Sequence, residues 1–355
     1  MDTDIKDDIL FSVKHHIGLI TLNRPKALNA LNFSMFKAML VQLLAWQVDD
    51  TVHAVVIQAV PGRAFCAGGD VRWVYDEGRD APLIPLELFK HEYRLDYLTS
   101  QLKKPYIALM DGLTIGGGVG VTLHGSHPVA SEQFVFTMPE ASIGFFPDIG
   151  SSHLLCACPD GVGLYLGLTG RRMNAADSRT LGVVKYTVPS HAFALILEDL
   201  FAADLSTAAD VKVSDCLMRY QAAMPAGNLT TEIDEIQRCF GNKKTLHEVF
   251  EALDKENTAW AVETKAVLLQ QSPLSLQVTF QQLQRAKGLS LKDCLSMDYD
   301  LAYHFLNDHD FYEGVRARLV DKDKAPCWQP ASWDTVSQQI VLNYFEKPTE
   351  IEPLW

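Results

Sequence analysis

The sequence contains no apolar run of the roughly 18 residues that a membrane-spanning helix requires. Its opening stretch, MDTDIKDDIL, is acidic, whereas a secretory leader places basic residues before an apolar segment. We therefore expect no membrane association and favour a bacterial cytoplasmic protein. A mitochondrial matrix protein whose presequence had been removed would have the same composition.

Basic residues are in the minority, because 31 Lys and Arg stand against 44 Asp and Glu for a net charge of -13. Proteins that bind nucleic acids neutralise phosphates with Lys and Arg, so this balance argues against a nucleic-acid partner. A small anionic ligand is still compatible with it, since such a ligand needs only a local basic patch.

Cysteine is sparse and irregular, with seven residues scattered from Cys66 to Cys327. An odd number in a chain of this length makes a poor disulfide framework and indicates a reducing compartment. Cys156 and Cys158 lack a second Cys or His pair at zinc-finger spacing, so we expect no metal site. A G-x-S-x-G nucleophile elbow and a phosphate-binding P-loop are also absent.

Hydrophobic residues make up 48% of the 355 residues, which is enough for a sizeable core. Alternation over 17–21 predicts a strand, helical spacing of apolar residues over 32–47 predicts an amphipathic helix, and the apolar run at 53–60 predicts a buried strand. The order strand, helix, strand indicates a parallel crossover unit. A further buried strand is expected at 104–112.

The pattern changes near residue 229. The earlier part alternates between predicted strands and helices, which is typical of an α/β fold. Beyond it the expected helices lie at 231–240, 246–254 and 257–271, followed by one that starts at Ser272 and Pro273 as N-cap and first helical residue. We therefore divide the chain into an α/β core, 1–228, and a helical C-terminal region, 229–355.

Two glycine-rich turns each follow a predicted buried strand: GRAFCAGGD at 62–70 and DGLTIGGGVG at 111–120. Glycines at such places let backbone N–H groups approach a ligand, as in anion nests and oxyanion holes. The alternative is that the glycines only allow a helix to pack closely on a sheet. From the glycines alone both interpretations stay open.

The stretch MPEASIGFFPDIG places two carboxylates, Glu140 and Asp148, among apolar and small residues. Acids in such surroundings are candidates for catalysis, and the alternative is a capping or solvated role.

Four segments, NRPKALNAL, AFCAGGDVR, KPYIALMDGLTIGGGVG and MPEASIGFFPDIG, resemble motifs of the crotonase (enoyl-CoA hydratase/isomerase) superfamily in the order in which they occur there. The finer match is to its 3-hydroxyisobutyryl-CoA hydrolase branch. Gly120 stands where a hydratase has its first catalytic glutamate, and Asp148 stands where hydratases have glycine. The stretch 309–331 also looks like the ending of that branch, and the resemblance spans roughly 10–335.

The resemblance implies a crotonase (ClpP-like) α/β fold of repeated ββα units in two roughly perpendicular sheets, with C-terminal helices covering the active site. It also implies that the backbone N–H groups of Gly69 and Gly117 form an oxyanion hole for the thioester carbonyl. Such donors, aimed at developing negative charge, contribute about 3 to 4 kcal/mol each to catalysis.

The resemblance assigns a role to each acid. Glu140 would be the catalytic carboxylate, either as a nucleophile that forms an acyl-enzyme anhydride or as a base that activates water. Asp148 would bind the 3-hydroxyl group of the substrate and orient the acyl group. Glu92, in KHEYRLDYL, matches a pocket-lining glutamate of the branch's EEY stretch, with His91 in place of the second acid.

The same resemblance places coenzyme A along PKAL and AGGDV. The residues expected to bind it are Arg24, Lys26, Ala27, Leu28, Ala67, Gly69, Asp70, Val71 and Arg72. The chain departs from the branch at PDIGSSH, where relatives continue PDVGGG or PDVGGS. Ser151, Ser152 and His153 are therefore expected to reshape the rim of the acyl pocket.

The activity implied is hydrolysis of the thioester of 3-hydroxyisobutyryl-CoA, and of 3-hydroxypropionyl-CoA, in valine catabolism. One alternative is an enoyl-CoA hydratase or isomerase, which the glycine at position 120 disfavours. Another is a catalytically silent binding protein on the same fold. No cofactor is expected beyond the CoA that the substrate carries, and a homo-oligomer is compatible because trimers are common in the superfamily.

Overall fold

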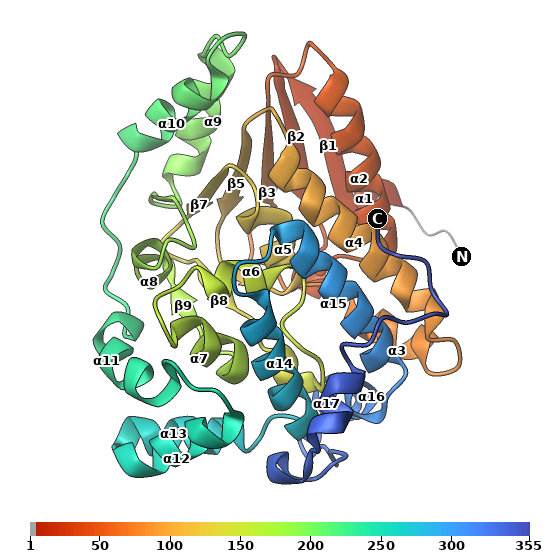
Figure 1. Cartoon of the computed structure of the whole chain (residues 1–355). Coiled ribbons are helices and arrows are strands. Elements are labelled where there is room, and N and C mark those ends of the chain that lie inside the picture. Colours follow the sequence, from red (N-terminus) through yellow and green to blue (C-terminus); the bar gives the residue numbers. More distant parts are fainter. Residues whose placement is uncertain (1–4) are drawn as a thin grey trace. The chain divides into compact units, whose positions relative to one another are not determined.

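The computed structural model describes residues 5–355 (Figure 1). They divide into two compact units. Unit 1 comprises Met1–Asp70, Arg94–Phe136 and Met173–Asn228, and unit 2 comprises Val71–Tyr93, Thr137–Arg172 and Leu229–Trp355. One of these divisions falls at 228/229, where the sequence analysis placed its boundary, but the predicted organisation into 1–228 and 229–355 stays a prediction. Two earlier segments, however, group with the C-terminal helices in unit 2.

Unit 1 is built on a six-stranded sheet. Its strands, in spatial order, are β1 (Ile9–Lys14), β2 (Ile17–Leu22), β3 (Ala54–Ala59), β5 (Tyr106–Met110), β7 (His127–Ala130) and β10 (Tyr186–Thr187). The pair β1 and β2 is antiparallel, and the other pairs are parallel. The predicted strand, helix, strand crossover is confirmed, because β2 and β3 run parallel on either side of α2 (Phe33–Val48) in the chain.

A second, four-stranded sheet has the order β4 (Ala64–Cys66), β6 (Leu113–Ile115), β8 (Val135–Thr137) and β9 (Met173–Asn174). The predicted two-sheet α/β fold is therefore confirmed. The remaining short helices of unit 1 are α1 (Ile5–Asp8), η1 (Pro25–Ala27), α5 (Gly117–Leu123) and α8 (Ala175–Thr180). Helix α4 (Leu83–Gln101) crosses the division after Tyr93.

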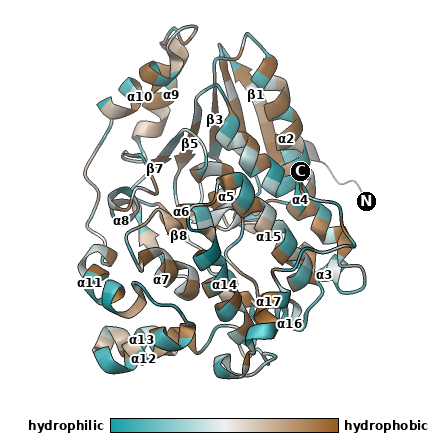
Figure 2. Ribbon diagram, in the orientation of Figure 1, coloured by the Kyte–Doolittle hydropathy of each residue, from teal (hydrophilic) through white to brown (hydrophobic). Residues whose placement is uncertain are grey.

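The central strands β3, β5 and β7 are buried on both faces, which explains why they are continuous apolar runs rather than alternating ones. One face, with Ile17, Val56 and Ile107, packs against α9 (Ala192–Ala202) and α10 (Ala209–Arg219). Figure 2 shows the central strands in the brown of hydrophobic residues.

Helix α2 packs on the opposite face at a point of close approach. The indole ring of Trp46 lies over Gly18 of β2, where a Cβ atom would be 2.7 Å from a ring carbon. Phe11 contacts the same indole edge to face, with 6.1 Å between ring centroids. Glycine at position 18 is therefore a packing requirement.

Unit 2 is almost entirely helical. Its elements are α3 (Val71–Gly78), η2 (Glu140–Ile143), α6 (Ser151–Cys156), α7 (Val162–Thr169), α11 (Leu229–Phe240), α12 (Leu246–Glu256), α13 (Ala259–Leu268), α14 (Pro273–Ala286), α15 (Leu291–Leu306), α16 (His309–Val315), the π-helical turn η3 (Arg316–Val320), η4 (Trp333–Thr335) and α17 (Gln338–Asn343). The expected helices are confirmed with shifted ends. Ser272 caps α14, because its side chain accepts a hydrogen bond from the Ser275 N–H and Pro273 follows it.

Within residues 5–355, no helix is both long and apolar enough to cross a bilayer. The same residues contain no group of three or more His, Cys, Asp or Glu side chains placed to hold a metal ion. The cysteines are free thiols, and Cys66, Cys216, Cys239 and Cys294 are buried.

We expect Gly18→Ala to lower the free energy of unfolding by about 1–3 kcal/mol, because the added methyl group overpacks the indole of Trp46. Gly62→Ala is the matched control, since the nearest atom to a Cβ there is 3.8 Å away. Urea unfolding of both variants tests this. Equal stability of the two would show that the contact between α2 and the sheet tolerates a side chain at position 18.

Candidate active site

The two glycine-rich turns lie next to each other in unit 1, because β4 lies within the first and β6 within the second, and these two strands are parallel neighbours. Gly69 forms an isolated parallel bridge with Leu31, in which the Leu31 N–H donates to Gly68 O and the Asp70 N–H donates to Leu31 O. In a parallel ladder, the residue between two such hydrogen bonds, here Gly69, points its own N–H away from the partner strand. The Gly69 N–H is thus turned away from this bridge.

Gly117 is the first residue of α5, a position whose N–H has no acceptor within its own helix. It lies beside the other turn, since a Cβ on Gly68 would be 3.6 Å from the Gly117 nitrogen. The structure therefore brings together the two backbone segments predicted to form an oxyanion hole. The alternative interpretation, that glycine allows a helix to pack closely on a sheet, also applies at Gly118 of α5. A Cβ there would be 2.7 Å from the Cβ of Cys66 in β4.

Gly120 is crowded by an acid that the sequence analysis did not single out. A Cβ at position 120 would lie 2.6 Å from a carboxylate oxygen of Asp96, a fully buried residue of α4. The position that carries a glutamate in hydratases therefore has no room for a side chain unless Asp96 moves.

The two predicted CoA motifs are joined by hydrogen bonds in unit 1. The Ala67 N–H donates to Leu28 O at 3.0 Å, and the buried Asn29 side chain donates to Ala64 O at 3.0 Å. Asn29 was not anticipated from the sequence. Leu28 and Asn29 both adopt the left-handed region, which asparagine enters more readily than most residues. The asparagine within ALNAL is therefore the local signal in the sequence that could have identified this turn.

The basic residues predicted to bind CoA differ in whether an acidic side chain already pairs with them. Arg24 forms ion pairs with Asp8 and Asp70, both at 3.2 Å, so it already stabilises the turn at 24–30. Arg72, in unit 2, pairs with Asp76 at 2.8 Å on the exposed side of α3. Lys26 is exposed on η1 and forms no ion pair with another described side chain.

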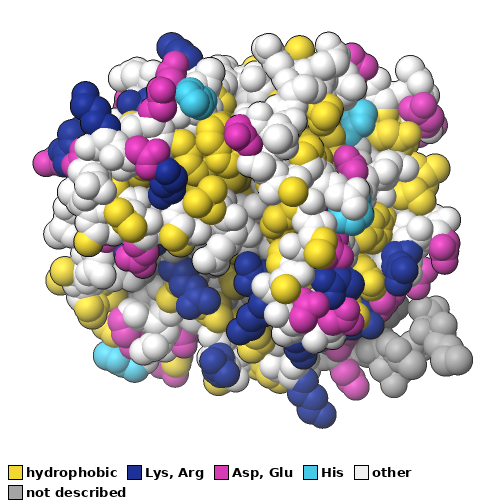
Figure 3. All heavy atoms as spheres, turned by 90° about the horizontal axis from the view of Figure 1, so that it is seen from below, with side chains coloured by type: hydrophobic (Ala, Val, Ile, Leu, Met, Phe, Trp, Pro, Cys, Tyr) yellow, Lys and Arg dark blue, Asp and Glu magenta, His cyan; other side chains and the backbone are white. Residues whose placement is uncertain are grey.

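On the face drawn in Figure 3, Lys and Arg side chains are interspersed with Asp, Glu and apolar side chains. A phosphate contact on that face would therefore come from individual cations rather than from a broad basic patch.

Glu140, in unit 2, begins η2 and is 7% exposed. Its turn is held from two sides by the C-terminal helices. The Ser272 N–H at the start of α14 donates to Ala141 O at 3.1 Å. On the other side α16 comes so close that a Cβ on Gly314 would be 2.3 Å from the Ile143 carbonyl group.

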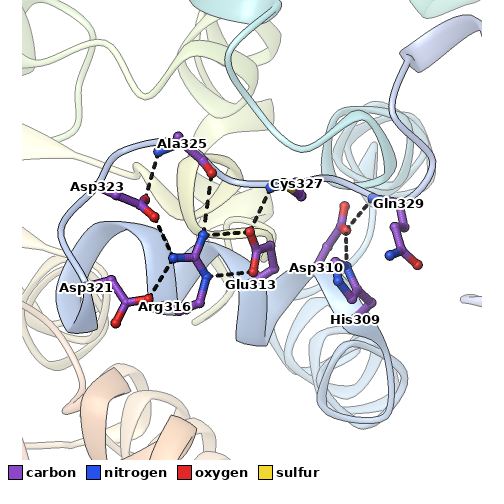
Figure 4. A network of polar contacts seen from close by, with 9 residues as sticks. All are labelled: His309, Asp310, Glu313, Arg316, Asp321, Asp323, Ala325, Cys327 and Gln329. Carbon is purple, nitrogen blue, oxygen red and sulfur yellow. Dashed lines mark hydrogen bonds and ion pairs between the residues drawn. The ribbon is translucent and has the colours of Figure 1, made fainter.

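A network of polar contacts keeps α16 and the following segment in place (Figure 4). Asp310 accepts hydrogen bonds from Ser272 Oγ at 2.6 Å and from the Gln329 N–H at 2.8 Å. Arg316 lies among three acids, Glu313, Asp321 and Asp323, at 2.8, 2.7 and 2.6 Å.

The stretch 309–331, which the sequence analysis matched to the end of the branch, thus helps to position the turn that carries Glu140. Neither Asp310 nor Ser272 was named there as a site residue. Their bond joins residues 38 positions apart, so nothing local in the sequence indicated it.

Asp148 and Glu92 are also buried in unit 2, at 5% and 2% exposed. The Tyr93 hydroxyl donates to Asp148 Oδ2 at 2.7 Å, and Tyr93 follows Glu92 in α4. The pKa of Tyr93 is raised well above its ordinary value, first by burial and then by the charges of Asp148, Asp298 and Glu92. Tyr93 therefore keeps its proton and acts as a donor to Asp148.

Burial dominates the electrostatics of the acids. It raises the pKa of Glu140 well above the usual range, and the negative charge of Asp148 raises it further. Burial also raises the pKa of Asp148, an effect that the hydrogen bond from Tyr93 opposes. None of the causes of these shifts is a cation, so protein donors and protonation must compensate for the buried charge.

Two polar residues of the C-terminal helices complete this cluster and were not predicted. Asp298 of α15 and Gln282 of α14 are both fully buried. The sequence contains a signal for Asp298, because it lies at helical spacing within the buried stripe formed by Leu295, Ala302 and Phe305.

The rim residues have separate environments. Ser151 and Ser152 are fully buried at the start of α6. The Ser151 hydroxyl has no hydrogen-bond partner among the described residues, whereas the Ser152 hydroxyl lies next to the Cys294 thiol, where it opposes the rise in pKa that burial causes in that thiol. His153 is exposed, with Nδ1 3.3 Å from Leu289 O. Their expected effect on the acyl pocket stays a prediction.

The chain matches the family model described as enoyl-CoA hydratase/isomerase over residues 17–345. It is 39% identical over 333 residues to the mitochondrial 3-hydroxyisobutyryl-CoA hydrolase of Xenopus laevis, covering 92% of this chain and 86% of that protein. It is 36% identical over 349 residues to the human protein of the same name, covering 97% and 90%.

Two solved structures share 34% of their sequence with this chain. One is named as a carnitinyl-CoA dehydratase from Mycobacterium thermoresistibile, with a TM-score of 0.90, covering 97% of this chain and 98% of that one. The other is named as an enoyl-CoA hydratase from Rhodobacter sphaeroides 2.4.1, with a TM-score of 0.88, covering 96% and 97%.

The raised pKa values predict how stability depends on pH. The folded state binds protons on Glu140 and Asp148 that the unfolded state has already released, so the free energy of unfolding should fall as pH rises from about 4. Each such group contributes at most about 1.4 kcal/mol per pH unit within its own titration range. In Glu140→Gln, which cannot ionise, the decline should be shallower.

Urea unfolding at a series of pH values measures this slope. The exposed residue Glu77 supplies a control, because Glu77→Gln should reproduce the wild-type slope. If Glu140→Gln does so as well, Glu140 does not titrate abnormally in the folded state.

Proposed function

Because the chain belongs to the enoyl-CoA hydratase/isomerase family, we propose that it hydrolyses the thioester of 3-hydroxyisobutyryl-CoA to 3-hydroxyisobutyrate and CoA, in valine catabolism. The name shared by the Xenopus laevis and human relatives supports this activity. 3-Hydroxypropionyl-CoA, which lacks one methyl group, is proposed as a second substrate.

The observation that favours hydrolysis over hydration is the crowding at Gly120. Addition of water to an enoyl-CoA in this family uses a pair of glutamates, and the space for the first is taken by the Asp96 carboxylate. Glu140 then has no partner at position 120, and a single acid in its place suits acyl transfer to water.

In the proposed reaction the thioester carbonyl oxygen accepts hydrogen bonds from the N–H groups of Gly69 and Gly117. As the carbonyl carbon becomes tetrahedral, negative charge grows on that oxygen, and these donors stabilise it more than they stabilise the ground state. This explains why glycines, with no side chain to obstruct a ligand, follow both β4 and β6.

Glu140 supplies the attack in one of two ways. As a nucleophile, a carboxylate oxygen bonds to the acyl carbon and the C–S bond breaks, releasing the CoA thiolate, which takes up a proton. Water then cleaves the anhydride. As a base, Glu140 removes a proton from water while the water oxygen bonds to the acyl carbon. The C–S bond then breaks, and the leaving CoA thiolate takes the proton from Glu140.

A raised pKa suits either role, because an ionised carboxylate of high pKa is a stronger base and nucleophile. Glu140 Oε2 is buried and has no hydrogen-bond partner among the described residues, and only a backbone hydrogen bond within Glu140 itself opposes the rise in its pKa. Acid quenching during turnover followed by intact-mass analysis distinguishes the roles. Only the nucleophilic route adds the mass of the acyl group to the protein.

Asp148 is proposed to accept a hydrogen bond from the 3-hydroxyl group of the substrate. Its Oδ2 is held by the Tyr93 hydroxyl at 2.7 Å, so Oδ1 is the oxygen proposed to meet the ligand. Glu92, adjacent to Tyr93 in α4, is proposed to line the same acyl pocket.

Coenzyme A is proposed to lie along Lys26, Ala27 and Leu28 and along the turn at 67–72, where the bond between Ala67 and Leu28 joins the two motifs. Among the predicted cations Lys26 is the best candidate for a phosphate contact. The reaction as proposed uses water and needs no metal or further cofactor. The word mitochondrial in the relatives' names favours the matrix over the bacterial cytoplasm as the compartment, and a homo-oligomer stays a prediction.

Two assays run on the same preparation test the proposed function. Release of free thiol from 3-hydroxyisobutyryl-CoA reports hydrolysis, and the absorbance of an enoyl-CoA reports hydration, which the names of the two 34% identical structures favour. We expect thiol release without hydration. Hydration alone would support the second activity, and neither signal would support a silent binding protein.

We expect Glu140→Gln to lower the rate of thiol release at least about 100-fold, because an amide is neither a nucleophile nor a base near neutral pH. Binding of the CoA ester, measured by calorimetry, should change little. Glu77→Gln is the control with unchanged turnover. More than about a tenth of wild-type turnover in Glu140→Gln would remove Glu140 from the catalytic role.

We expect Asp148→Ala to lose the preference for hydroxylated substrates. A site that binds a hydroxyl group can reject the analogue without it by several powers of ten, because its own buried polar group is then unpaired. The measurement is the ratio of kcat/KM for 3-hydroxyisobutyryl-CoA and isobutyryl-CoA. An unchanged ratio in Asp148→Ala would show that another residue recognises the hydroxyl group.

A further inference from the structure

Asp298 is a fully buried carboxylate of α15 that accepts a hydrogen bond from the loop that carries Asp148. Its Oδ2 accepts from the Gly150 N–H at 2.8 Å, and its Oδ1 accepts from Gln282 Nε2 at 2.8 Å. Burial raises its pKa, the charge of Asp148 raises it further, and no cation is among the causes of the shift. An acid in such a place is unfavourable unless neutral donors satisfy it.

Gln282 of α14 connects the same acid to the other side of the loop. Its Nε2 donates to Asp298 Oδ1 and also to Pro147 O, at 2.9 Å. The backbone on both sides of Asp148 is therefore held, at Pro147 by Gln282 and at Gly150 by Asp298. We call Asp298 and Gln282 the loop clamp.

The loop has a reason to need such a clamp. Ile149, directly after Asp148, has a φ of 56°, and Gly150 has a φ of 68°. A β-branched residue rarely adopts the left-handed region, and it persists there only when the surroundings hold it. Without the clamp, the loop would relax and the Asp148 carboxylate would change direction.

The direction of that carboxylate has two determinants. Tyr93 fixes one oxygen through its hydroxyl group at 2.7 Å, and the backbone fixes where the side chain starts. A shift of the backbone by a fraction of an ångström would turn Oδ1 away from the 3-hydroxyl group, whereas the turn at Glu140 is held separately by Ser272 and α16.

We propose that Asp298 and Gln282 are positioning residues that determine acyl-group specificity by fixing the loop of Asp148. The choice of substrate in this inference rests on the proposed function, whereas the hydrogen bonds of the loop clamp do not depend on it. Loss of the clamp should lower the rate on hydroxylated acyl-CoA substrates, whereas the rate on the analogue without a hydroxyl group, which depends on Glu140, should hardly change.

Asp298→Asn tests the proposal with little change in volume. An asparagine can accept from Gly150 or from Gln282 but not from both, because its amide nitrogen would face one of these donors. Gln282→Met is the second variant, since it keeps the length of the side chain and removes both donated bonds. Asp300→Asn is the matched control on α15, because that half-buried acid has no hydrogen bond to the loop.

In both clamp variants we expect the kcat/KM ratio of 3-hydroxyisobutyryl-CoA to isobutyryl-CoA to fall about tenfold or more, since small misplacements of a contacting group cost up to about 100-fold. The ratio should stay at the wild-type value in Asp300→Asn. A purely structural role would lower both rates in parallel. That outcome, or an unchanged ratio, would overturn the proposal.

Hydrogen exchange, followed by mass spectrometry of peptides covering 145–152, tests the clamp without reference to activity. The Gly150 amide should be protected in the wild type and in Asp300→Asn, and it should exchange faster in the clamp variants. Rapid exchange of Gly150 in the wild type would overturn the clamp even if neither variant folded. If the wild type released no thiol, the proposed function would fail, and protection lost in the clamp variants would still support the clamp.

Discussion

Burial of carboxyl groups without a cation is the constraint on which unit 2 depends. Glu140, Asp148 and Asp298 all have raised pKa values, and burial is the largest cause in each case. Such groups persist in a fold only where hydrogen-bond donors or protonation offset the lost hydration. Tyr93 donates a hydrogen bond to Asp148, and Gln282 donates one to Asp298. Both donors are needed where they lie because each offsets the lost hydration of a buried acid.

The C-terminal helices can be understood from this constraint. Helix α16 and the start of α14 hold the turn of Glu140, while α14 and α15 hold the loop of Asp148. Arg316 joins Glu313 of α16 to Asp321 and Asp323 in the segment that follows (Figure 4). This network stabilises α16, and none of its ion pairs involves Glu140 or Asp148. The C-terminal helices therefore decide how accurately these two acids are placed.

Burial of these acids lowers the stability of the fold, but it also raises their pKa values, which suits the proposed hydrolysis of a thioester. An acid kept away from water has a higher pKa, and its ionised form is a better base or nucleophile. Such a cluster is more stable when protonated, so the proposed reaction and folding favour opposite charge states of Glu140. This is the relation expected where local stability is given up for reactivity.

The sequence by itself determined three strands of the larger sheet, β2, β3 and β5, and the helices from α11 to α14, because these depend on periodicity. Contiguous motifs identified both glycine turns and the acids Glu140 and Asp148 as candidates. Tertiary structure alone decided that Asp96 fills the space at Gly120 and that Asp298 bonds to Gly150, 148 positions away. A buried polar residue in an amphipathic helix shows in the sequence that it needs a partner. Which partner it has depends on how distant helices pack, and no local pattern encodes that choice.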